Sequence, residues 1–480
     1  MHRLPWLTLA LTGIVACGGA ATPAAPSNEV QGSAPNHLYA HSYAGSTLGE
    51  KISAAITALP DSGGIVDAVD FVGEQRIDQT IQLGTAERPV ELRLGTVRLS
   101  ASVVPFELHP NAKLIGNDKT VITQDDGANL EWLITGTNVT DCEIAHLTVD
   151  GNRKGNTAAG SGIGMHTAKR CWLHHLTVQN TVGRFHPGIA FYDGPNGDNT
   201  VENNQVRNIG TLIDYADGIY VSGPGNKVRY NRITNATDFG VVCEACSDGL
   251  VRGNVIVDVP AGVAVGSGIA GFSAANNVIE DNTISGGNTT TLGVISVYKR
   301  NSTPPTSTIV RGNVIRDVVQ GHGIMINGAE GVIVENNVLG NIAVTYPSFG
   351  ILVKDSKDVT ITGGSIDSTG SFGIGIGASS NVKVDNVLIT DASRMGTGAS
   401  GIGLDVTQTN SSSITLTRLH IFDTETSRMS KRMLYCIDFG QGGTTNGVVI
   451  GDITFNDGAT YLGCRIDNIN FNNASQVTIY

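Results

Sequence analysis

The chain has 480 residues, of which 61 are glycine and only 15% are charged. Much glycine with few long apolar helical stripes favours β structure with many tight turns. The formal net charge of −12 argues against a nucleic-acid partner, because phosphate binding requires a basic face.

The N-terminus has the pattern of an export signal. A weakly basic start precedes an apolar run at residues 4–15, which is too short to span a bilayer, and Ile-Val-Ala-Cys follows at residues 14–17. These four residues resemble the lipobox of bacterial lipoproteins, which predicts cleavage before Cys17 and acylation of that cysteine. An ordinary secretory signal, cleaved after Ala16 or Ala20, is the alternative.

The predicted organisation has four parts. Residues 1–16 are the signal peptide, residues 17–36 the lipidated N-terminus with a flexible linker, residues 37–112 an N-terminal cap with the first coils, and residues 113–480 the main body. The linker is rich in Ala, Pro, Ser and Gly and has too few apolar residues to fold. We expect an exported protein that is either lipid-anchored in the bacterial cell envelope or secreted.

A helix is expected at residues 48–59. Thr47 and Glu50 have the spacing of a capping box, and Ile52, Ile56 and Leu59 form one apolar face. Because the end of a solenoid would expose core and strand edges, we expect this helix to plug the N-terminal end.

A motif of alternating apolar residues around an asparagine recurs downstream. Its asparagine position is filled as follows: Asn204, Asn231, Asn254, Asn282, Asn313, Asn337, then Gly364 and Asn386. The intervals run from 22 residues (364 to 386) to 31 residues (282 to 313), which is the repeat length of a solenoid. We attribute the shared Asn and Gly to a left-handed turn. Leu147 and Leu176 occupy the position upstream.

A second ladder consists of glycines, each followed by alternating apolar residues: Gly162, Gly188, Gly218, Gly240, Gly323, Gly350, Gly373 and Gly401. This pattern describes short strands with alternate side chains in a core, and stacking the strands buries a column of Ile, Val and Leu. The predicted fold is all-β, a single-stranded right-handed parallel β-helix with an N-terminal capping helix.

These features resemble the pectin-lyase-like superfamily of right-handed β-helices. The resemblance covers about residues 45–470 and includes the capping helix, the asparagine ladder and the segment Leu-Thr-Val-Asp-Gly-Asn-Arg at 147–153. It implies the fold. The superfamily includes polysaccharide lyases, hydrolases, epimerases, adhesins and phage tailspikes, so its implication for activity is an analogy.

One outward stripe of side chains follows from the alternation. If Ile219 faces the core, Tyr220 faces solvent, and the same alternation aligns His166, Tyr192, Ser222 and Glu244. The loops entering these coils add Lys169, Arg170, Arg184, His186, Asp214, Asp217 and Asp238. Aromatic faces, cations and carboxylates together suit a groove for an anionic polysaccharide, whereas an ordinary solvated strand face is the alternative.

Within this groove we expect Lys169, Arg184, His166, Tyr192 and Glu244 to bind substrate. Later coils are plainer, with glycines at the equivalent places. The adjacent Lys299 and Arg300 either extend the groove or belong to an exposed loop that ends at Pro304-Pro305, and the loop is the preferred interpretation.

Hydrolysis needs two carboxylates, for which Asp217 and Asp238 are the best pair. The segment Ala-Asp-Gly-Ile at 216–219 is similar to the Asn-Thr-Asp-Gly of polygalacturonases, but Phe239 stands where that family has a second Asp. The Gly-His-Gly at 321–323 matches another of the family's segments, but several coils too far downstream. Turn capping is the alternative role for both aspartates.

For β-elimination, a base removes the proton beside a uronate carboxylate that cations neutralise. His186 or Arg184 fits the base, Lys169 or Arg170 the neutraliser, and Tyr192 or Tyr220 the acid. An epimerase would use similar groups, but the Asp-Pro-His segment of alginate epimerases is missing. The predicted catalytic residues are therefore Asp217, Asp238, His186 and Tyr220, with a non-catalytic glycan-binding or surface-structural protein as the alternative.

Besides Cys17, the chain has three close cysteine pairs: Cys142 with Cys171, Cys243 with Cys246, and Cys436 with Cys464. Stacked strands place equivalent Cα atoms about 4.8 Å apart, which is within disulfide range, so we expect disulfides in an exported protein. Buried free cysteines are the alternative. No metal or cofactor is expected, apart from a possible Ca²⁺ site among Asp193, Asp198 and Asp214.

Overall fold

The computed structural model divides the chain into two units, Met1–Ala34 and Pro35–Tyr480. The residues that it describes belong to the second unit. They are residues 36–479 without 159, 161, 184, 193, 195, 212–214, 267–273, 301–302, 396–400, 405, 407–409, 425–435, 440–444, 457–468 and 471–473. The predicted signal peptide and the lipidation site Cys17 lie outside the described residues.

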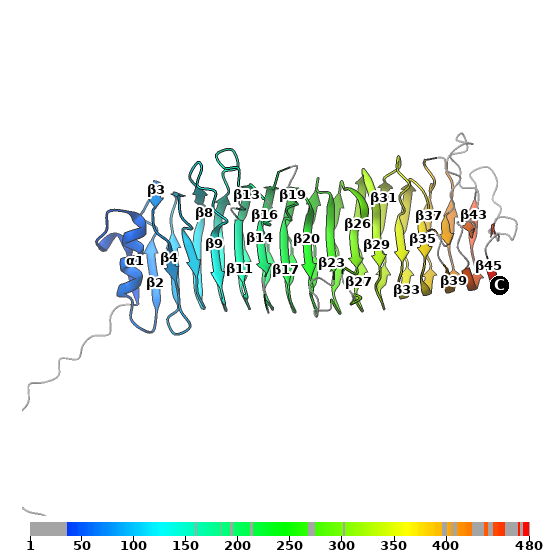
Figure 1. Ribbon diagram of the computed structural model, residues 1–480, viewed down its shortest axis with the longest axis horizontal. Coiled ribbons are helices and arrows are strands. Elements are labelled where there is room, and N and C mark those ends of the chain that lie inside the picture. The colour runs from blue at the N-terminus through cyan, green and yellow to red at the C-terminus, as the bar shows by residue number, and fades with distance from the viewer. Residues whose placement is uncertain are drawn as a thin grey trace, which may run out of the picture. The chain divides into compact units, whose positions relative to one another are not determined.

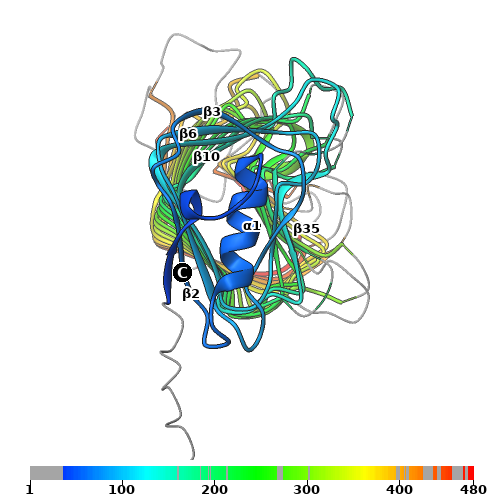
Figure 2. The same cartoon turned by 90° about the vertical axis from the view of Figure 1, so that its left-hand side faces the viewer.

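The predicted capping helix is α1 (Leu48–Ala58), and its capping box between Thr47 and Glu50 is confirmed. Ile52 is fully buried and Leu59, just past the end of the helix, is 5% exposed. Viewed from the N-terminal end of the stack, α1 lies within the ring of the first coils (Figure 2), so it covers the end of the core. Among the described residues, none of the helices has the length and hydropathy that a transmembrane segment needs.

The strands form two parallel sheets that run along the stack and gain strands with each coil (Figure 1). The 15-stranded sheet consists of β4 (Ile81–Leu83), β7 (Phe106–Leu108), β9 (Trp132–Thr137), β11 (Gly162–His166), β14 (Ile189–Tyr192), β17 (Ile219–Ser222), β20 (Phe239–Glu244), β23 (Ala261–Gly266), β26 (Asn288–Tyr298), β29 (Gln320–Asn327), β32 (Ile351–Lys354), β35 (Ile374–Gly377), β38 (Ile402–Leu404), β41 (Ile437–Asp438) and β44 (Ile469–Asn470).

The 30-stranded sheet has two strands in most coils, which meet at a corner. Its members are β1 (His37–Tyr39), β2 (Gly64–Ala68), β3 (Gly73–Ile77), β5 (Val90–Leu94), β6 (Val97–Ala101), β8 (Ala112–Gln124), β10 (Glu143–Asp150), β12 (Trp172–His174), β13 (Thr177–Thr181), β15 (Thr200–Glu202), β16 (Gln205–Ile209), β18 (Lys227–Arg229), β19 (Arg232–Ala236), β21 (Leu250–Arg252), β22 (Val255–Val257), β24 (Val278–Glu280), β25 (Thr283–Ser285), β27 (Ile309–Arg311), β28 (Val314–Val318), β30 (Ile333–Glu335), β31 (Val338–Ile342), β33 (Lys357–Thr362), β34 (Ser365–Thr369), β36 (Ser380–Asp385), β37 (Leu388–Thr390), β39 (Ser411–Thr417), β40 (His420–Phe422), β42 (Thr445–Gly451), β43 (Thr454–Asn456) and β45 (Ala474–Ile479). The predicted parallel β-helix is confirmed.

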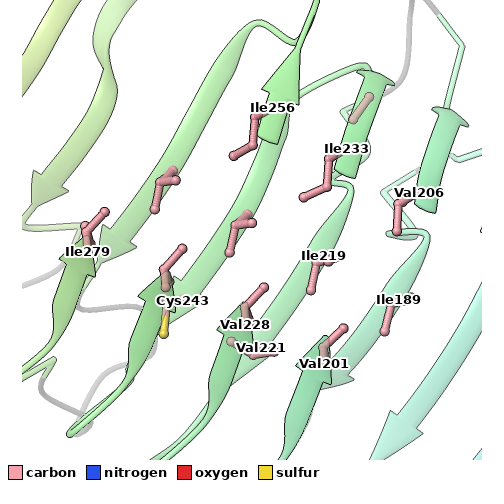
Figure 3. Packing of buried hydrophobic residues seen from close by; sticks show 14 of the residues in the cluster. Ile189, Val201, Val206, Ile219, Val221, Val228, Ile233, Cys243, Ile256 and Ile279 are labelled. Atoms are coloured by element: carbon pink, nitrogen blue, oxygen red, sulfur yellow. The ribbon is translucent and has the colours of Figure 1, made fainter. Parts of the chain in front are cut away.

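The core is a column of aliphatic side chains stacked from coil to coil. Ile189 pairs with Ile219 in one sheet, and Val206 pairs with Ile233 in the other. All four are fully buried and belong to one cluster, seen from close by in Figure 3. Burying each such side chain contributes about 1.5–3 kcal/mol, so the column is the main source of stability.

The asparagine ladder lies inside the corner between the two strands of the 30-stranded sheet. Buried side-chain hydrogen bonds explain the asparagines, whereas the sequence predicted a left-handed turn at these positions. The Asn254 side chain is fully buried; its Oδ1 accepts hydrogen bonds from N and Nδ2 of Asn231, both at 3.0 Å. The residue with the left-handed backbone is the one that precedes each ladder asparagine in sequence, for example Tyr230, with φ 58°, before Asn231. Asn386 is itself left-handed, with φ 56°, and Val387 fills the ladder position, so placing Asn386 in the ladder was wrong.

Two disulfides join cysteines of the predicted pairs. Cys142 and Cys171, in neighbouring coils, have a Cα–Cα distance of 4.5 Å, and Cys243 and Cys246, in one turn, have a distance of 5.5 Å. Cys436 is buried and disulfide-bonded. Its expected partner Cys464 lies outside the described residues.

Candidate functional site

A cavity of about 680 Å³ opens on the outer face of the 15-stranded sheet. Side chains of β9, β14, β17, β20 and β26 line it, together with residues of the loops that precede β14, β17 and β20. The lining residues are Trp132, Phe185, His186, Pro187, Ala190, Tyr192, Tyr215, Asp217, Tyr220, Asp238, Phe239, Val242, Glu244, Tyr298 and Arg300. The cavity therefore combines aromatic walls with three carboxylates and one arginine.

Strand register builds the floor of this cavity. Tyr220 pairs with Ala190 on one side and with Val242 on the other, so one outward row crosses three coils. The next outward row has the predicted stripe, in which His166 pairs with Tyr192 and Ser222 pairs with Glu244. Side chains that are 20 to 30 residues apart in sequence thus become neighbours, because parallel strands stack about 4.8 Å apart.

Asp217 and Asp238 enter the cavity from the turns before β17 and β20. Asp217 Oδ1 accepts a hydrogen bond of 3.1 Å from the backbone N–H of Phe239. Burial, followed by the negative charge of Asp238, raises the pKa of Asp217 well above its ordinary value. Burial also raises the pKa of Asp238, to about 6, although the positive charge of Arg300 opposes this shift. Burial and the charge of Asp238 both favour the neutral form of Asp217, which suits Asp217 to donate a proton and Asp238 to be the partner carboxylate.

Glu244 is held by two partners on the cavity floor. It is 8% exposed; Tyr220 donates its hydroxyl to Oε2 at 2.5 Å, and Arg300 Nη1 lies 2.6 Å from Oε1. Burial, reinforced by the charge of Glu244, raises the pKa of Tyr220, which therefore remains a hydroxyl donor. The Glu244 charge in turn raises the pKa of Arg300. These contacts fix three side chains around the aspartate pair.

An aromatic wall closes the side nearest β9. The Trp132 ring lies 5.0 Å from the His186 ring, edge to face, and 5.5 Å from the Tyr192 ring, measured between centroids. Trp132 is 4% exposed, and its buried Nε1–H has no hydrogen-bond partner among the described residues. The indole covers Gly164, where a Cβ atom would lie 2.4 Å from the ring. Glycine is therefore required beneath it.

Two further aromatic side chains project at the mouth of the cavity. Phe185 is 74% exposed and Tyr215 is 67% exposed. Their rings are stacked, with centroids 6.3 Å apart and an interplanar angle of 19°. Exposed, parallel aromatic faces beside carboxylates are a surface on which a sugar ring can stack.

Most of the predicted site residues come together in this cavity: His186, Tyr192, Asp217, Tyr220, Asp238 and Glu244. His166 lies behind it, with its ring 3.9 Å from that of Tyr192. Lys169 is exposed on the next turn and is not part of the lining. Arg184 lies outside the described residues.

Arg300 is placed differently from the preferred interpretation of its segment. The sequence suggested an exposed loop outside the groove, whereas the structure pairs Arg300 with Glu244 in the cavity lining, although Arg300, like Lys299, stays exposed to solvent. Sequence reasoning also missed Trp132 and Tyr298. The signal for Tyr298 was its register, since it follows Glu244 by two coils in the same outward row.

His322, in the Gly-His-Gly segment, lies on β29 outside the cavity. Its Nδ1 accepts a hydrogen bond of 3.2 Å from the backbone N–H of Phe349. Burial lowers the pKa of His322 to about 4, so the ring is neutral at physiological pH. This histidine supports the fold and does not contact the aspartate pair.

Metal ligands gather elsewhere. Among the described residues, His146, His174 and His175 bring three ligand atoms within 4.8 Å of one another, on the 30-stranded sheet. Of the suggested calcium ligands, Asp198 is an exposed left-handed turn residue with φ 54°, and Asp193 and Asp214 lie outside the described residues. The sequence had singled out no histidine cluster.

Comparison with a solved structure supports the fold. A tailspike protein mutant of E. coli bacteriophage HK620, in complex with a pentasaccharide, has a TM-score of 0.52 at 12% identity, covering 90% of this chain and 77% of that chain. The A-module of mannuronan C-5 epimerase AlgE4 from Azotobacter vinelandii has a TM-score of 0.47 at 18% identity. The match covers 80% of this chain and 95% of that chain.

Sequence comparison identifies the family. No curated protein sequence matches significantly. A family model described as "Periplasmic copper-binding protein (NosD)" matches residues 113–303 and 211–418, which together span more than half of the 480 residues. The chain therefore belongs to the NosD family.

Proposed function

We propose that this protein is an exported carbohydrate-active enzyme that hydrolyses a glycosidic bond in the cavity on the 15-stranded sheet. The observation that carries this proposal is the pair Asp217 and Asp238, whose pKa values are raised to different extents in a cavity with aromatic walls. Glycoside hydrolysis requires one carboxylic acid and one carboxylate, and different environments produce that division.

In the proposed reaction, Asp217 is the general acid and Asp238 the general base. The protonated Asp217 gives its proton to the leaving glycosidic oxygen while the ionised Asp238 takes a proton from the attacking water. The C–O bond breaks as the water oxygen bonds to the anomeric carbon. Proton exchange with solvent then restores both aspartates.

Elimination receives less support from the cavity. The mechanism needs a cation against the uronate carboxylate, but Lys169 is not part of the lining, and Arg170 is bound to Asp141 at 2.6 and 2.7 Å. Arg300, the lining arginine, already pairs with Glu244. Because three carboxylates face one arginine, we favour a neutral glycan over the anionic polysaccharide that the sequence suggested.

Two further observations are compatible with this proposal. The HK620 tailspike, which shares the fold, was solved with a pentasaccharide. The family description is periplasmic, which agrees with the proposed export, and lipid anchoring at Cys17 remains our proposal. The family description also names copper. The lining residues include one histidine, His186, and no cysteine, so they offer few ligands for copper. The hydrolysis that we propose does not involve a copper ion.

The test is a panel of neutral and uronate-containing polysaccharides, incubated with the full-length protein. New reducing ends and ultraviolet absorbance are measured together. We expect reducing ends without absorbance, lost in Asp217→Asn and in Asp238→Asn. Asp355→Asn is the matched control, because Asp355 is an exposed turn residue outside the cavity. An unsaturated, absorbing product would overturn hydrolysis in favour of elimination.

A non-catalytic glycan-binding protein is the second candidate function. The exposed, stacked rings of Phe185 and Tyr215 favour it, because they offer a binding surface that needs no reacting group. Binding of a glycan without cleavage, equally strong in wild type and Asp217→Asn, would establish this second function and reject the first.

A further inference from the structure

The histidine cluster arises from the corner of the 30-stranded sheet. One residue per coil there has a left-handed backbone, and Asp118, His146 and His175 hold this place in three successive coils, with φ of 64°, 58° and 52°. The imidazole rings of His146 and His175 therefore stack, with centroids 4.9 Å apart and an interplanar angle of 13°. In the following coil the same place is held by Asn203.

His174 adds a third ring, nearly perpendicular to the other two. It is the last residue of β12, and its centroid lies 5.7 Å from that of His146 and 5.1 Å from that of His175. It is 5% exposed and stacks on Trp172 at 3.7 Å. Packing thus fixes the ring, while the exposed His175 leaves the cluster open to solvent.

Two carboxylates orient the rings. Asp118 Oδ1 lies 2.9 Å from Nδ1 of His146, and Glu143 Oε1 lies 3.2 Å from Nε2 of His174. Lys113 holds Glu143 at 2.8 Å. Each carboxylate engages one ring nitrogen and leaves the other for a ligand, which is how metal-binding histidines are commonly oriented.

The remaining nitrogens lie close together. Nδ1 of His174 is 2.8 Å from Nδ1 of His175, which is a hydrogen bond between the two rings. A bound ion would take the place of the proton that these two nitrogens share, and one ligand atom from each of the three histidines lies within 4.8 Å of the others. Because imidazole sites bind Cu²⁺ more tightly than Zn²⁺, Cu²⁺ is the preferred ion.

We propose that His146, His174 and His175 form a binding site for one divalent late transition metal ion, which prefers Cu²⁺ to Zn²⁺. Three imidazole nitrogens are ligands that suit both ions, and affinity for such sites is greatest for Cu²⁺. Asp118 and Glu143 offset part of the ion's charge. The site is separate from the cavity, because its residues belong to the other sheet.

The experiment uses the full-length protein, purified through a tag that contains no histidine. Calorimetric titrations with CuSO₄ and, separately, ZnSO₄ give stoichiometry and affinity, and electron paramagnetic resonance of the Cu²⁺ complex shows nitrogen ligands directly. We expect one Cu²⁺ per chain with nitrogen hyperfine structure, and Zn²⁺ binding that is at least tenfold weaker. No Cu²⁺ binding, or tighter binding of Zn²⁺, would overturn the proposal.

The decisive variant is His146→Asn/His175→Asn. Asparagine tolerates a left-handed backbone and already holds the equivalent place at Asn203, so the coils should keep their stacking. We expect Cu²⁺ affinity to fall at least tenfold while the melting temperature of the metal-free protein is unchanged. His420→Asn, which removes an exposed histidine from a late coil, is the matched control and should bind as wild type does.

A third variant separates a metal site from a merely structural stack of rings. Asp118→Asn leaves the three histidines in place but weakens the orientation of His146, so Cu²⁺ affinity should fall by about 10- to 100-fold. Unchanged Cu²⁺ affinity and an unchanged resonance spectrum in the double variant would show that the ion binds elsewhere. If the double variant does not fold, His175→Asn alone, at an exposed position, gives the same test.

Discussion

The early and late coils of the 15-stranded sheet have the same backbone arrangement, but their outer surfaces differ: the cavity lies on the early coils, and aromatic rings cover glycines of the late coils. Over β14, β17 and β20 the outward row of Ala190, Tyr220 and Val242 is the floor of the cavity. In β35 and β38 the same row contains Gly375 and Gly403. The glycines that the sequence showed at these outward positions of the late coils lie beneath other side chains.

Aromatic rings from the preceding turns cover the late glycines. A Cβ atom on Gly375 would lie 2.7 Å from the Phe349 ring, and one on Gly403 would lie 2.6 Å from the Phe372 ring. These two rings stack with centroids 5.8 Å apart and an interplanar angle of 10°. One repeating backbone thus gives either a cavity or a sealed surface, depending on which turns fold over it.

The largest effect is expected from the aspartate pair in the early coils. Asp217→Asn keeps the oxygen that accepts the Phe239 N–H but has no proton to donate at neutral pH, so turnover should fall by about 10²–10⁴-fold. Initial rates of reducing-end formation measure it. A late-coil change, Asp355→Asn, should leave the rate within about twofold. Equal losses of turnover in both variants would contradict a catalytic role for the aspartate pair of the early coils.

The pH dependence sharpens the assignment of roles. Asp238 acts as a base only when ionised, so below its pKa of about 6 the rate should fall roughly tenfold per pH unit. The pKa of Asp217 is also raised, well above its ordinary value, so loss of its proton should limit the rate on the alkaline side and give a bell-shaped profile. Melting curves at each pH control for unfolding. A profile that is flat from pH 4 to pH 8 would contradict this assignment.

In the late coils the expected effect is on stability. Gly375→Ala forces the Phe349 ring to move, and overpacking of this kind costs about 1–3 kcal/mol. Thermal and urea unfolding measure the loss, while activity in the early coils should persist. Gly340→Ala is the matched control, because its nearest neighbour is the flexible end of Arg316, at 3.2 Å. Equal stabilities of the two variants would show that the sealed surface tolerates a methyl group.

The smallest effect is expected at the mouth of the cavity. Replacing either stacked ring, in Phe185→Ala or Tyr215→Ala, should weaken glycan binding by about 0.5–1.5 kcal/mol, or about 2- to 12-fold. Calorimetry with an oligosaccharide product measures it. Tyr346→Ala removes an exposed aromatic residue of the late coils and should change nothing. Unaltered binding in both mouth variants would place the sugar deeper in the cavity.

Local and repeating signals in the sequence were enough to predict the coils and their order. Period-two alternation, a capping box and cysteines one coil apart are local or strictly repeating signals, so α1, the strand stack and the Cys142–Cys171 pair could be read directly. Six of the nine residues predicted for catalysis and substrate binding line one cavity, because outward positions in successive coils must align. The ladder asparagines were also found, but their buried hydrogen bonds were mistaken for left-handed turns.

The contacts between side chains that are distant in sequence could not be predicted from the repeats. Arg300 reaches Glu244 across 56 residues, and His186 reaches Glu131 across 55 residues, which places Trp132 in the cavity wall. The histidine cluster likewise depends on which residue of each coil turns the corner. Such contacts depend on register and on the path of the turns, which a repeat pattern leaves undetermined, since each coil accepts turns of different length and direction.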